Sequence, residues 1–357
     1  MTTIEAILDA RIPQDIFGDL PADVGDALNE AGRIYRQFAR ETHPDAADGD
    51  GMAFSRLTDL YQLAQRLITS GDYHMVGLAG RTINAKNRKY TIQERFFYGE
   101  ICDTYMCSHG LIRVSHVPQD NDLMRNEAKT IRGVRNEVDD KWKVYFPELI
   151  DSFSIRDATN KDRHANVLKP LLANRPINAE SWYPLSRIIK AFPGGVDPRD
   201  AAWIWRRMLI TLGLSHDSGY VNHAAIPASW MIQPPEHGII LLDWTFAKQF
   251  GEKPNAILPK YKHWYPQEVI DKRISDTATD IYLAALSIIQ LMGGNPLKRT
   301  LPDRVPKQLR AYFRACTLSS VTKRSDDADR LLENFDEIIE RLWGPRQFRP
   351  FVVPATI

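Results

Sequence analysis

The chain has few of the features that would place it at once in a secreted or strongly charged class. Its 357 residues include only 3 cysteines, Cys102, Cys107 and Cys316, and no C-x-x-C pair, so neither a disulfide framework nor a zinc site is indicated. We interpret these cysteines as free thiols in a reducing compartment. Lys and Arg number 46 against 45 Asp and Glu, which gives no overall electrostatic attraction to nucleic acid or to an anionic membrane.

Long apolar segments are also lacking. No run of 18 apolar residues occurs, and residues 1–9 have neither the basic start nor the apolar centre of a signal peptide. We therefore expect a cytoplasmic protein with no membrane partner. The composition, 43% hydrophobic and 25% charged, is that of an ordinary globular protein, and the length predicts about two domains.

Two amphipathic helices joined by a polar loop are predicted near the N-terminus. Apolar residues recur over residues 23–40 at the three-and-four spacing of a helix. The opposite face of this segment carries three arginines, Arg33, Arg36 and Arg40. Pro44 disfavours helix at His43, the residue before it, so the helix should end there, and a loop that contains Asp45 should follow through Gly51. A second apolar stripe over residues 54–67 completes a predicted helical hairpin.

This hairpin resembles the J-domain family of co-chaperones. The resemblance rests on the tripeptide His43-Pro44-Asp45 in the predicted loop and on flanking residues in the family's register. These flanking residues are Tyr35, Phe38, Ala39, Phe54, Leu57 and Tyr61. In that family the tripeptide and a basic helix face engage a seventy-kilodalton heat-shock chaperone of the DnaK class. The resemblance implies that His43, Pro44 and Asp45 form the ATPase-stimulating tip and that the three arginines form the docking face. Guanidinium groups in a row suit this role because they steer a negatively charged partner surface, although alone they would indicate only a solvated helix face.

A basic segment at residues 73–89 separates the hairpin, residues 1–72, from the rest of the chain. Its cations are Arg81, Lys86, Arg88 and Lys89. We interpret it as a linker; a weaker alternative is that these side chains contact nucleic acid. Short strand-like runs follow it, and from about residue 200 the patterns are mainly helical. This order predicts an α+β fold in which an all-α hairpin precedes a two-lobed domain.

A second motif lies near residue 243. Asp243 follows the apolar run at residues 239–242, so a carboxylate is expected at the end of a buried strand. Residues 219–227 align without a gap with the catalytic segment of protein kinases, and Asp243 then falls at the aspartate of the D-F-G motif. Residues 90–350 therefore resemble a protein kinase, with an N-lobe at about 90–180 and a C-lobe at about 181–350.

The kinase resemblance implies roles for several further residues. In the C-lobe, Glu268 looks like the glutamate of the A-P-E motif, Arg324 its ion-pair partner, and Asp280 the buried aspartate of the large helix. In the N-lobe, the matching positions are Gly99 of the glycine-rich loop, Arg113 of the third strand and Glu127 of the following helix. Together with Asp243 as metal ligand, these N-lobe residues are the predicted nucleotide site, and ATP and Mg²⁺ are the cofactors it would take.

The groups that perform phosphoryl transfer are nevertheless absent from the aligned positions. The catalytic aspartate is replaced by Ala224, the metal-binding asparagine by Ser229 and the third-strand lysine by Arg113. Asp243 is followed by Trp244 and a threonine rather than by Phe-Gly. Because no carboxylate is available to accept the substrate proton, we predict a pseudokinase without catalytic residues.

Two functions are consistent with this sequence. In the first, the chain is a co-chaperone that recruits and stimulates a DnaK-class chaperone, and its kinase-like domain binds a client or partner protein. In the alternative, the kinase-like domain is a divergent ATP-dependent kinase or nucleotide-transfer enzyme that uses Asp243 as its metal ligand. The missing acceptor at Ala224 favours the first.

Overall fold

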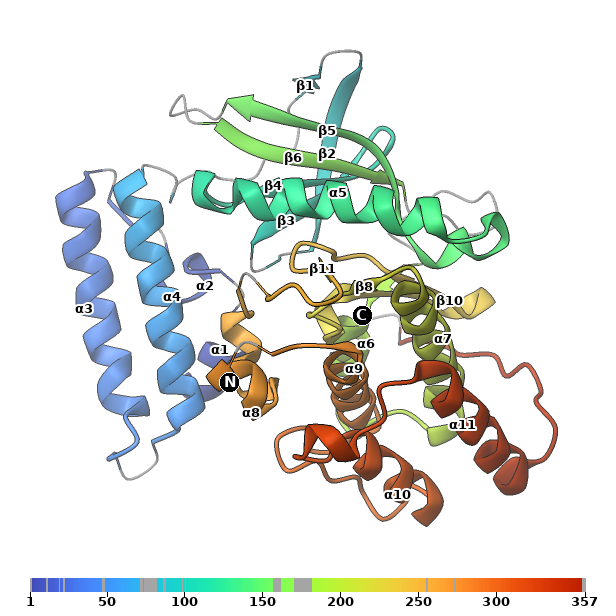
Figure 1. Cartoon of the computed structure of the whole chain (residues 1–357). Coiled ribbons are helices and arrows are strands. Elements are labelled where there is room, and N and C mark those ends of the chain that lie inside the picture. Colours follow the sequence, from blue (N-terminus) through green and yellow to red (C-terminus); the bar gives the residue numbers. More distant parts are fainter. Residues whose placement is uncertain are drawn as a thin grey trace. The chain divides into compact units, whose positions relative to one another are not determined.

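The computed structural model describes residues 2–354 apart from 11, 19, 22, 47–48, 71–72, 74–81, 86–87, 98, 100, 157–161, 170–181, 255 and 273. Helices and sheets are both present, as expected for an α+β protein (Figure 1). The chain divides into two units, residues 1–124 with 152–167 and residues 125–151 with 168–357. Among the described helices, none is both long and apolar enough to cross a lipid bilayer. The three cysteines are buried and form no disulfide bonds.

Four helices begin the first unit. They are α1 (Thr3–Asp9), α2 (Gln14–Phe17), α3 (Val24–Thr42) and α4 (Gly51–Ser70). The two long helices lie side by side (Figure 1) and confirm the helices predicted over 23–40 and 54–67, each extended by a few residues. Their contact includes a stack of the Tyr35 and Tyr61 rings, 4.3 Å between centroids. The helical core contains Ile7, Phe17, Ala31, Leu57, Leu60, Ala64 and, from beyond the helices, Val117.

A six-stranded sheet follows the helices. Its strands are β1 (Thr82–Asn84), β2 (Lys89–Phe97), β3 (Cys102–Cys107), β4 (Gly110–Ser115), β5 (Glu148–Arg156) and β6 (Asp162–Lys169), and their order in the sheet is β1-β2-β3-β4-β6-β5. Within the segment predicted as a basic linker, residues 82–84 form β1 and Lys89 begins β2. Residues 82–84 and Lys89 of that segment therefore extend the sheet, whereas Tyr73 belongs to the core of the N-terminal helices. Helix α5 (Asn121–Glu137) is inserted between β4 and β5.

The second unit is mainly helical. Its helices are α6 (Leu185–Ala191), α7 (Pro198–Asp217), α8 (Gln267–Lys272), α9 (Thr277–Leu291), α10 (Lys307–Cys316) and α11 (Ala328–Trp343), and its short strands are β7 (Tyr183–Pro184), β8 (Tyr220–Val221), β9 (Trp230–Gln233), β10 (Gly238–Leu241) and β11 (Lys248–Gln249). Helix α9 is buried along almost its whole length and packs on α7, which also packs on α11. The mainly helical character predicted from about residue 200 is confirmed by α7, α9, α10 and α11.

Candidate functional sites

The loop between α3 and α4 holds the predicted chaperone-binding tripeptide. Helix α3 ends at His43, whose extended backbone (φ −57°, ψ 137°) suits a residue that precedes proline. The loop is closed at its base because Asp50 N–H donates to Thr42 O at 3.1 Å, and Ala46 N–H donates to His43 O at 2.9 Å. These bonds fix the direction in which the tripeptide leaves the hairpin.

Two residues that the sequence analysis did not single out shape this loop. Asp50 begins α4 by accepting hydrogen bonds from the N–H groups of Met52 (2.8 Å) and Ala53 (2.9 Å). Gly49 lies so close to the His43 carbonyl that any Cβ at this position would overlap it. An acidic residue just before an apolar stripe was the available signal for the helix cap, whereas nothing in the sequence reveals the close approach of Gly49.

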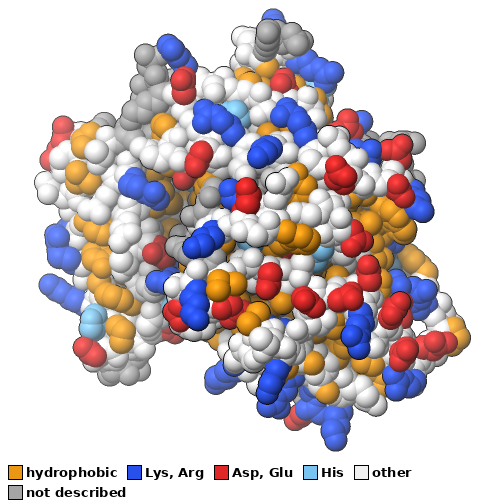
Figure 2. All heavy atoms as spheres, viewed as in Figure 1, with side chains coloured by type: hydrophobic (Ala, Val, Ile, Leu, Met, Phe, Trp, Pro, Cys, Tyr) orange, Lys and Arg blue, Asp and Glu red, His pale blue; other side chains and the backbone are white. Residues whose placement is uncertain are grey.

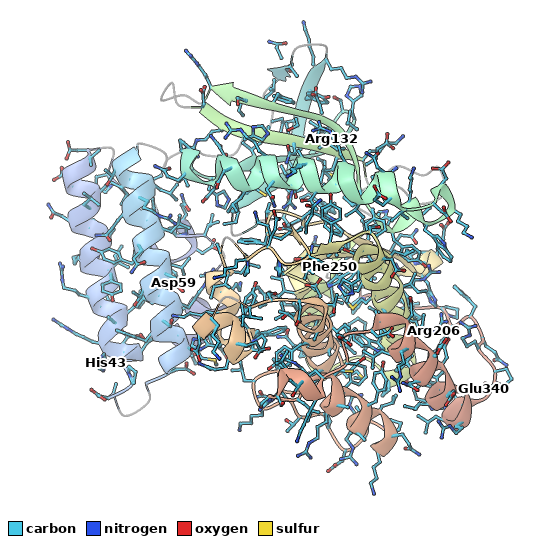
Figure 3. The ribbon with its side chains drawn as sticks, viewed as in Figure 1. His43, Asp59, Arg132, Arg206, Phe250 and Glu340 are labelled. Carbon is cyan, nitrogen blue, oxygen red and sulfur yellow. The ribbon has the colours of Figure 1, made fainter. Side chains whose placement is uncertain are left out.

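The tripeptide itself is exposed. The His43 side chain is 50% exposed and that of Asp45 is 90% exposed. The His43 ring packs edge-on against Phe54, 5.1 Å between centroids, and its Nδ1 accepts a hydrogen bond from Asp45 N–H at 3.2 Å. Figure 3 shows His43 at the far end of the hairpin, where the two long helices are joined. An oriented imidazole and a neighbouring carboxylate are thus presented together to solvent.

The predicted docking face also points to solvent. Arg33, Arg36 and Arg40 are all exposed, and Figure 2 shows basic side chains along the outer edge of α3. Arg33 is held by Glu30 through two hydrogen bonds of 2.7 and 2.9 Å. Arg36 and Arg40 have no ion-pair partner within the described part of the chain, so their charge is available to a partner.

The second candidate site, the segment at residues 219–227 for which the sequence predicts a kinase-like role, is held by a buried carboxylate in the second unit. Asp280 on α9 accepts hydrogen bonds from the backbone N–H groups of Asn222 and His223, both at 2.7 Å. The Asp280 side chain also contacts His216 Nε2 at 3.2 Å. His223 adopts a left-handed backbone conformation (φ 62°), and Tyr265 Oη donates to its carbonyl at 2.9 Å. Sequence analysis identified Asp280 but not these partners.

The polar side chains around Ala224 are used in bonds within the segment. Ala224 is buried, and its carbonyl accepts a 2.6 Å hydrogen bond from Ser229 Oγ. Asn222 donates to the Asp243 carbonyl at 2.8 Å and accepts from Ala224 N–H at 3.1 Å. The side chain of residue 224 is therefore only a methyl group, and the Ser229 hydroxyl is already engaged within the segment.

Asp243 is partly buried, and a neighbouring threonine engages its carboxylate. Oδ1 accepts from Thr245 N–H at 3.0 Å and from Thr245 Oγ1 at 2.6 Å. Among the described residues, no group of three or more His, Cys, Asp or Glu side chains is arranged to hold a metal ion. Any Mg²⁺ here would rely on Asp243 with ligands from outside this residue set.

The residue after Asp243 is fixed by the fold. Trp244 is completely buried, its indole N–H donates to Leu241 O at 2.8 Å, and its ring lies 5.7 Å from that of Phe146. Trp244 N–H also points to Glu127 Oε1 at 3.4 Å, so the predicted helix glutamate contacts the backbone of this segment. Asn126 adds hydrogen bonds to the carbonyls of residues 245 and 247. Helix α5 is therefore attached to the segment by two consecutive side chains.

The remaining predicted residues lie in both units. In the second unit, Glu268 and Arg324 form an ion pair, and the Arg324 guanidinium lies 4.9 Å from the centre of the Tyr282 ring. In the first unit, Arg113 is buried in β4. Gly99 lies between β2 and β3, where a Cβ would overlap the Cys102 carbonyl. Of the basic segment's cations, Arg88 and Lys89 are exposed, and Arg81 and Lys86 lie outside the described residues.

Comparison with protein-family models finds no family that matches this chain. A search of curated proteins likewise finds no match. The geometry of the residues described above is therefore the basis for a proposal.

Proposed function

We propose that the chain is a J-domain co-chaperone that stimulates a DnaK-class chaperone and carries a catalytically inactive kinase-like domain. The observation that carries the proposal is the loop between α3 and α4. It presents His43 and Asp45 to solvent from a closed backbone, beside a helix face on which Arg36 and Arg40 form no ion pair with any described residue. Rigid presentation and a positive surface are what rapid recognition of an acidic partner requires.

The topology supports a kinase-like interpretation of the remainder. Strands β2, β3, β4, β6 and β5 are adjacent in that order, with α5 inserted after β4. This is the arrangement expected for a kinase N-lobe. The contact of Asp280 with two consecutive N–H groups and the Glu268–Arg324 ion pair agree with the roles that the resemblance implies.

The lack of a proton acceptor favours a binding role over phosphoryl transfer. The Ala224 side chain cannot accept a proton, and the Ser229 hydroxyl already donates to the Ala224 carbonyl. The kinase-like domain would then hold a client or partner protein, while the N-terminal helices recruit the chaperone. Asp243 would remain as a nucleotide contact without catalysis.

The test is single-turnover ATP hydrolysis by a DnaK-class chaperone in the presence of the full-length chain. We expect stimulation by the wild type and its loss with His43→Gln or Asp45→Asn, because each substitution alters the exposed tip without removing a core contact. His263→Gln is the matched control, since His263 is also exposed but lies in the second unit. Equal stimulation by His43→Gln and wild type, or none by the wild type, would contradict the proposal.

The docking face is tested by charge reversal. Arg36→Glu with Arg40→Glu should weaken chaperone binding at least about tenfold at low salt, and the difference should shrink as salt rises because the attraction is screened. Arg330→Glu serves as the control because Arg330 is exposed on α11 and has no side-chain ion pair among the described residues. An equal effect of both variants would show that net charge, rather than this face, governs binding.

A further inference from the structure

The chain beyond α11 turns back along the second unit (Figure 1). Residues 345–354, Pro-Arg-Gln-Phe-Arg-Pro-Phe-Val-Val-Pro, are called the tail below. They lie against a surface, called the tail groove, that is formed by Phe192, Asp197, Asp200, Trp203 and His237.

One part of the tail groove is aromatic. The Phe351 ring lies 5.7 Å from that of Phe192 and 6.1 Å from that of Trp203, and Phe351 is 6% exposed. Trp203 stacks on His237 with 4.2 Å between ring centroids, and Phe348 also stacks on His237, at 4.5 Å. Phe348 and Phe351, which are separated by two residues in the tail, thus pack on neighbouring rings of the groove.

The other part of the groove is acidic. Arg349 Nε lies 2.8 Å from Asp200 Oδ1, and its Nη2 lies 3.5 Å from Asp197 Oδ2. Both carboxylates belong to the start of α7, where Asp197 is the N-cap. His237 Nε2 contacts the Arg349 carbonyl at 2.8 Å, so the same tail residue is recognised through its side chain and its backbone.

The tail is attached in a way that permits exchange. Within residues 345–354 no backbone N–H donates to a backbone carbonyl, in contrast to Gly344, which donates to Glu340. Three of these ten residues are proline, which lacks the N–H and favours an extended chain. The Arg349 side chain is 43% exposed and Phe348 is 66% exposed. Side-chain contacts and the contact of His237 with the Arg349 carbonyl hold the tail. Extended proline-containing segments in aromatic grooves are a recurrent mode of peptide recognition.

We propose that the tail groove is a peptide-binding site for extended partner segments that contain Arg-Pro-aromatic, and that the tail occupies it as an intramolecular ligand. The aromatic surface would select the aromatic residue, and the paired carboxylates would select arginine. The tail would compete with a partner at the effective concentration of a tethered segment, which lies in the millimolar range. The groove belongs entirely to the second unit, and its test does not depend on chaperone stimulation.

The experiment measures fluorescence anisotropy of a labelled peptide of residues 345–354 with full-length protein. Arg349→Glu and, separately, Phe351→Ser weaken the tail's own contacts, so each variant should bind the peptide at least about tenfold more tightly than the wild type. Adding Asp197→Asn and Asp200→Asn to Arg349→Glu should remove the gain, because the asparagines keep the shape and lose the charge. Arg341→Glu is the control for charge reversal near the C-terminus and should behave as wild type.

Thermal melts establish that each variant is folded, and Arg349→Glu alters only partly exposed contacts. The proposal is overturned if neither tail variant binds the peptide more tightly than the wild type. It is also overturned if the groove asparagines leave binding unchanged, or if a peptide with Arg349→Glu binds equally well. Each of these results would mean that the tail is a fixed part of this fold.

Discussion

The loop at residues 43–50 and the segment at residues 222–245 use polar side chains in opposite ways. In the loop, backbone bonds close the turn and leave the His43 and Asp45 side chains at the surface. In the segment, side chains make the closing bonds, and nearly all of them are buried. When backbone hydrogen bonds close a loop, its polar side chains remain available to a partner. When side chains make the closing hydrogen bonds, few polar side chains remain available for chemistry.

The largest effect should come from Asp280. Asp280→Asn should reduce the free energy of unfolding of the second unit by about 3 to 5 kcal/mol, because two backbone N–H groups lose a charged acceptor in a buried site. All eight tryptophans lie in this unit, so tryptophan fluorescence during urea denaturation measures it directly. Asp45→Asn, at 90% exposure, should change stability by less than about 0.5 kcal/mol. Similar losses for the two variants would remove the contrast.

Ala224→Asp sharpens the same contrast. It restores the acceptor that a kinase needs but buries a carboxylate where the Ala224 side chain is only 1% exposed. We expect a loss of about 2 to 3 kcal/mol of stability and no magnesium-dependent ADP formation by the full-length chain. ATP consumption by this variant, or by the wild type and abolished by Asp243→Asn, would favour the divergent-enzyme alternative.

Gly49→Ala tests whether the backbone is what orders the tip. Because a Cβ at residue 49 would overlap the His43 carbonyl, the loop must move, at a cost of about 1 to 3 kcal/mol. Chaperone stimulation should fall as far as it does with His43→Gln, although both tip side chains remain. Gly194→Ala is the control, since a Cβ there meets no atom within 4 Å. Unchanged stimulation by Gly49→Ala would show that loop geometry is unimportant.

The smallest expected effect is a pH dependence of the second unit. Burial lowers the pKa of His223, despite the opposing effect of Asp280, and burial also lowers the pKa of His237. A histidine with a lowered folded pKa binds protons more readily when unfolded, so stability should fall as the pH drops from 7.5 to 5.5. His223→Gln with His237→Gln should reduce this difference in tryptophan-monitored denaturation, whereas exposed His263→Gln should not. An undiminished difference would assign the pH dependence to other groups.

The helical spacing of apolar residues predicted the helices well because each helix buries one continuous stripe of apolar side chains. The apolar spacing over residues 23–40 and 54–67 predicted α3 and α4, and the mainly helical pattern from about residue 200 agrees with α7, α9, α10 and α11. The composition of the basic segment at residues 73–89 was less informative: it predicted a linker, but residues 82–84 form the strand β1. A three-residue edge strand buries little, and its hydrogen bonds to β2 have no signature in side-chain type.

The candidate sites were predictable only in part. A tripeptide and a carboxylate after an apolar run can be read from sequence, so His43 and Asp243 were found. The partners of the buried Asp280 carboxylate could not be predicted, because His216 and Asn222 meet Asp280 across about sixty residues of sequence and only the fold brings them together. The tail groove is the extreme case, with partners from α6, α7, a hairpin and the C-terminus.

Val117, which follows β4, belongs to the core of the N-terminal helices and is 1% exposed. The core of the hairpin is therefore completed by a residue that lies outside the hairpin itself. A fragment cut after Tyr73 would leave an opening in its own core where Val117 sits. If these helices were transferred to another protein, that protein would have to supply a substitute for the Val117 side chain. The hairpin without the first strands of the sheet would be less stable.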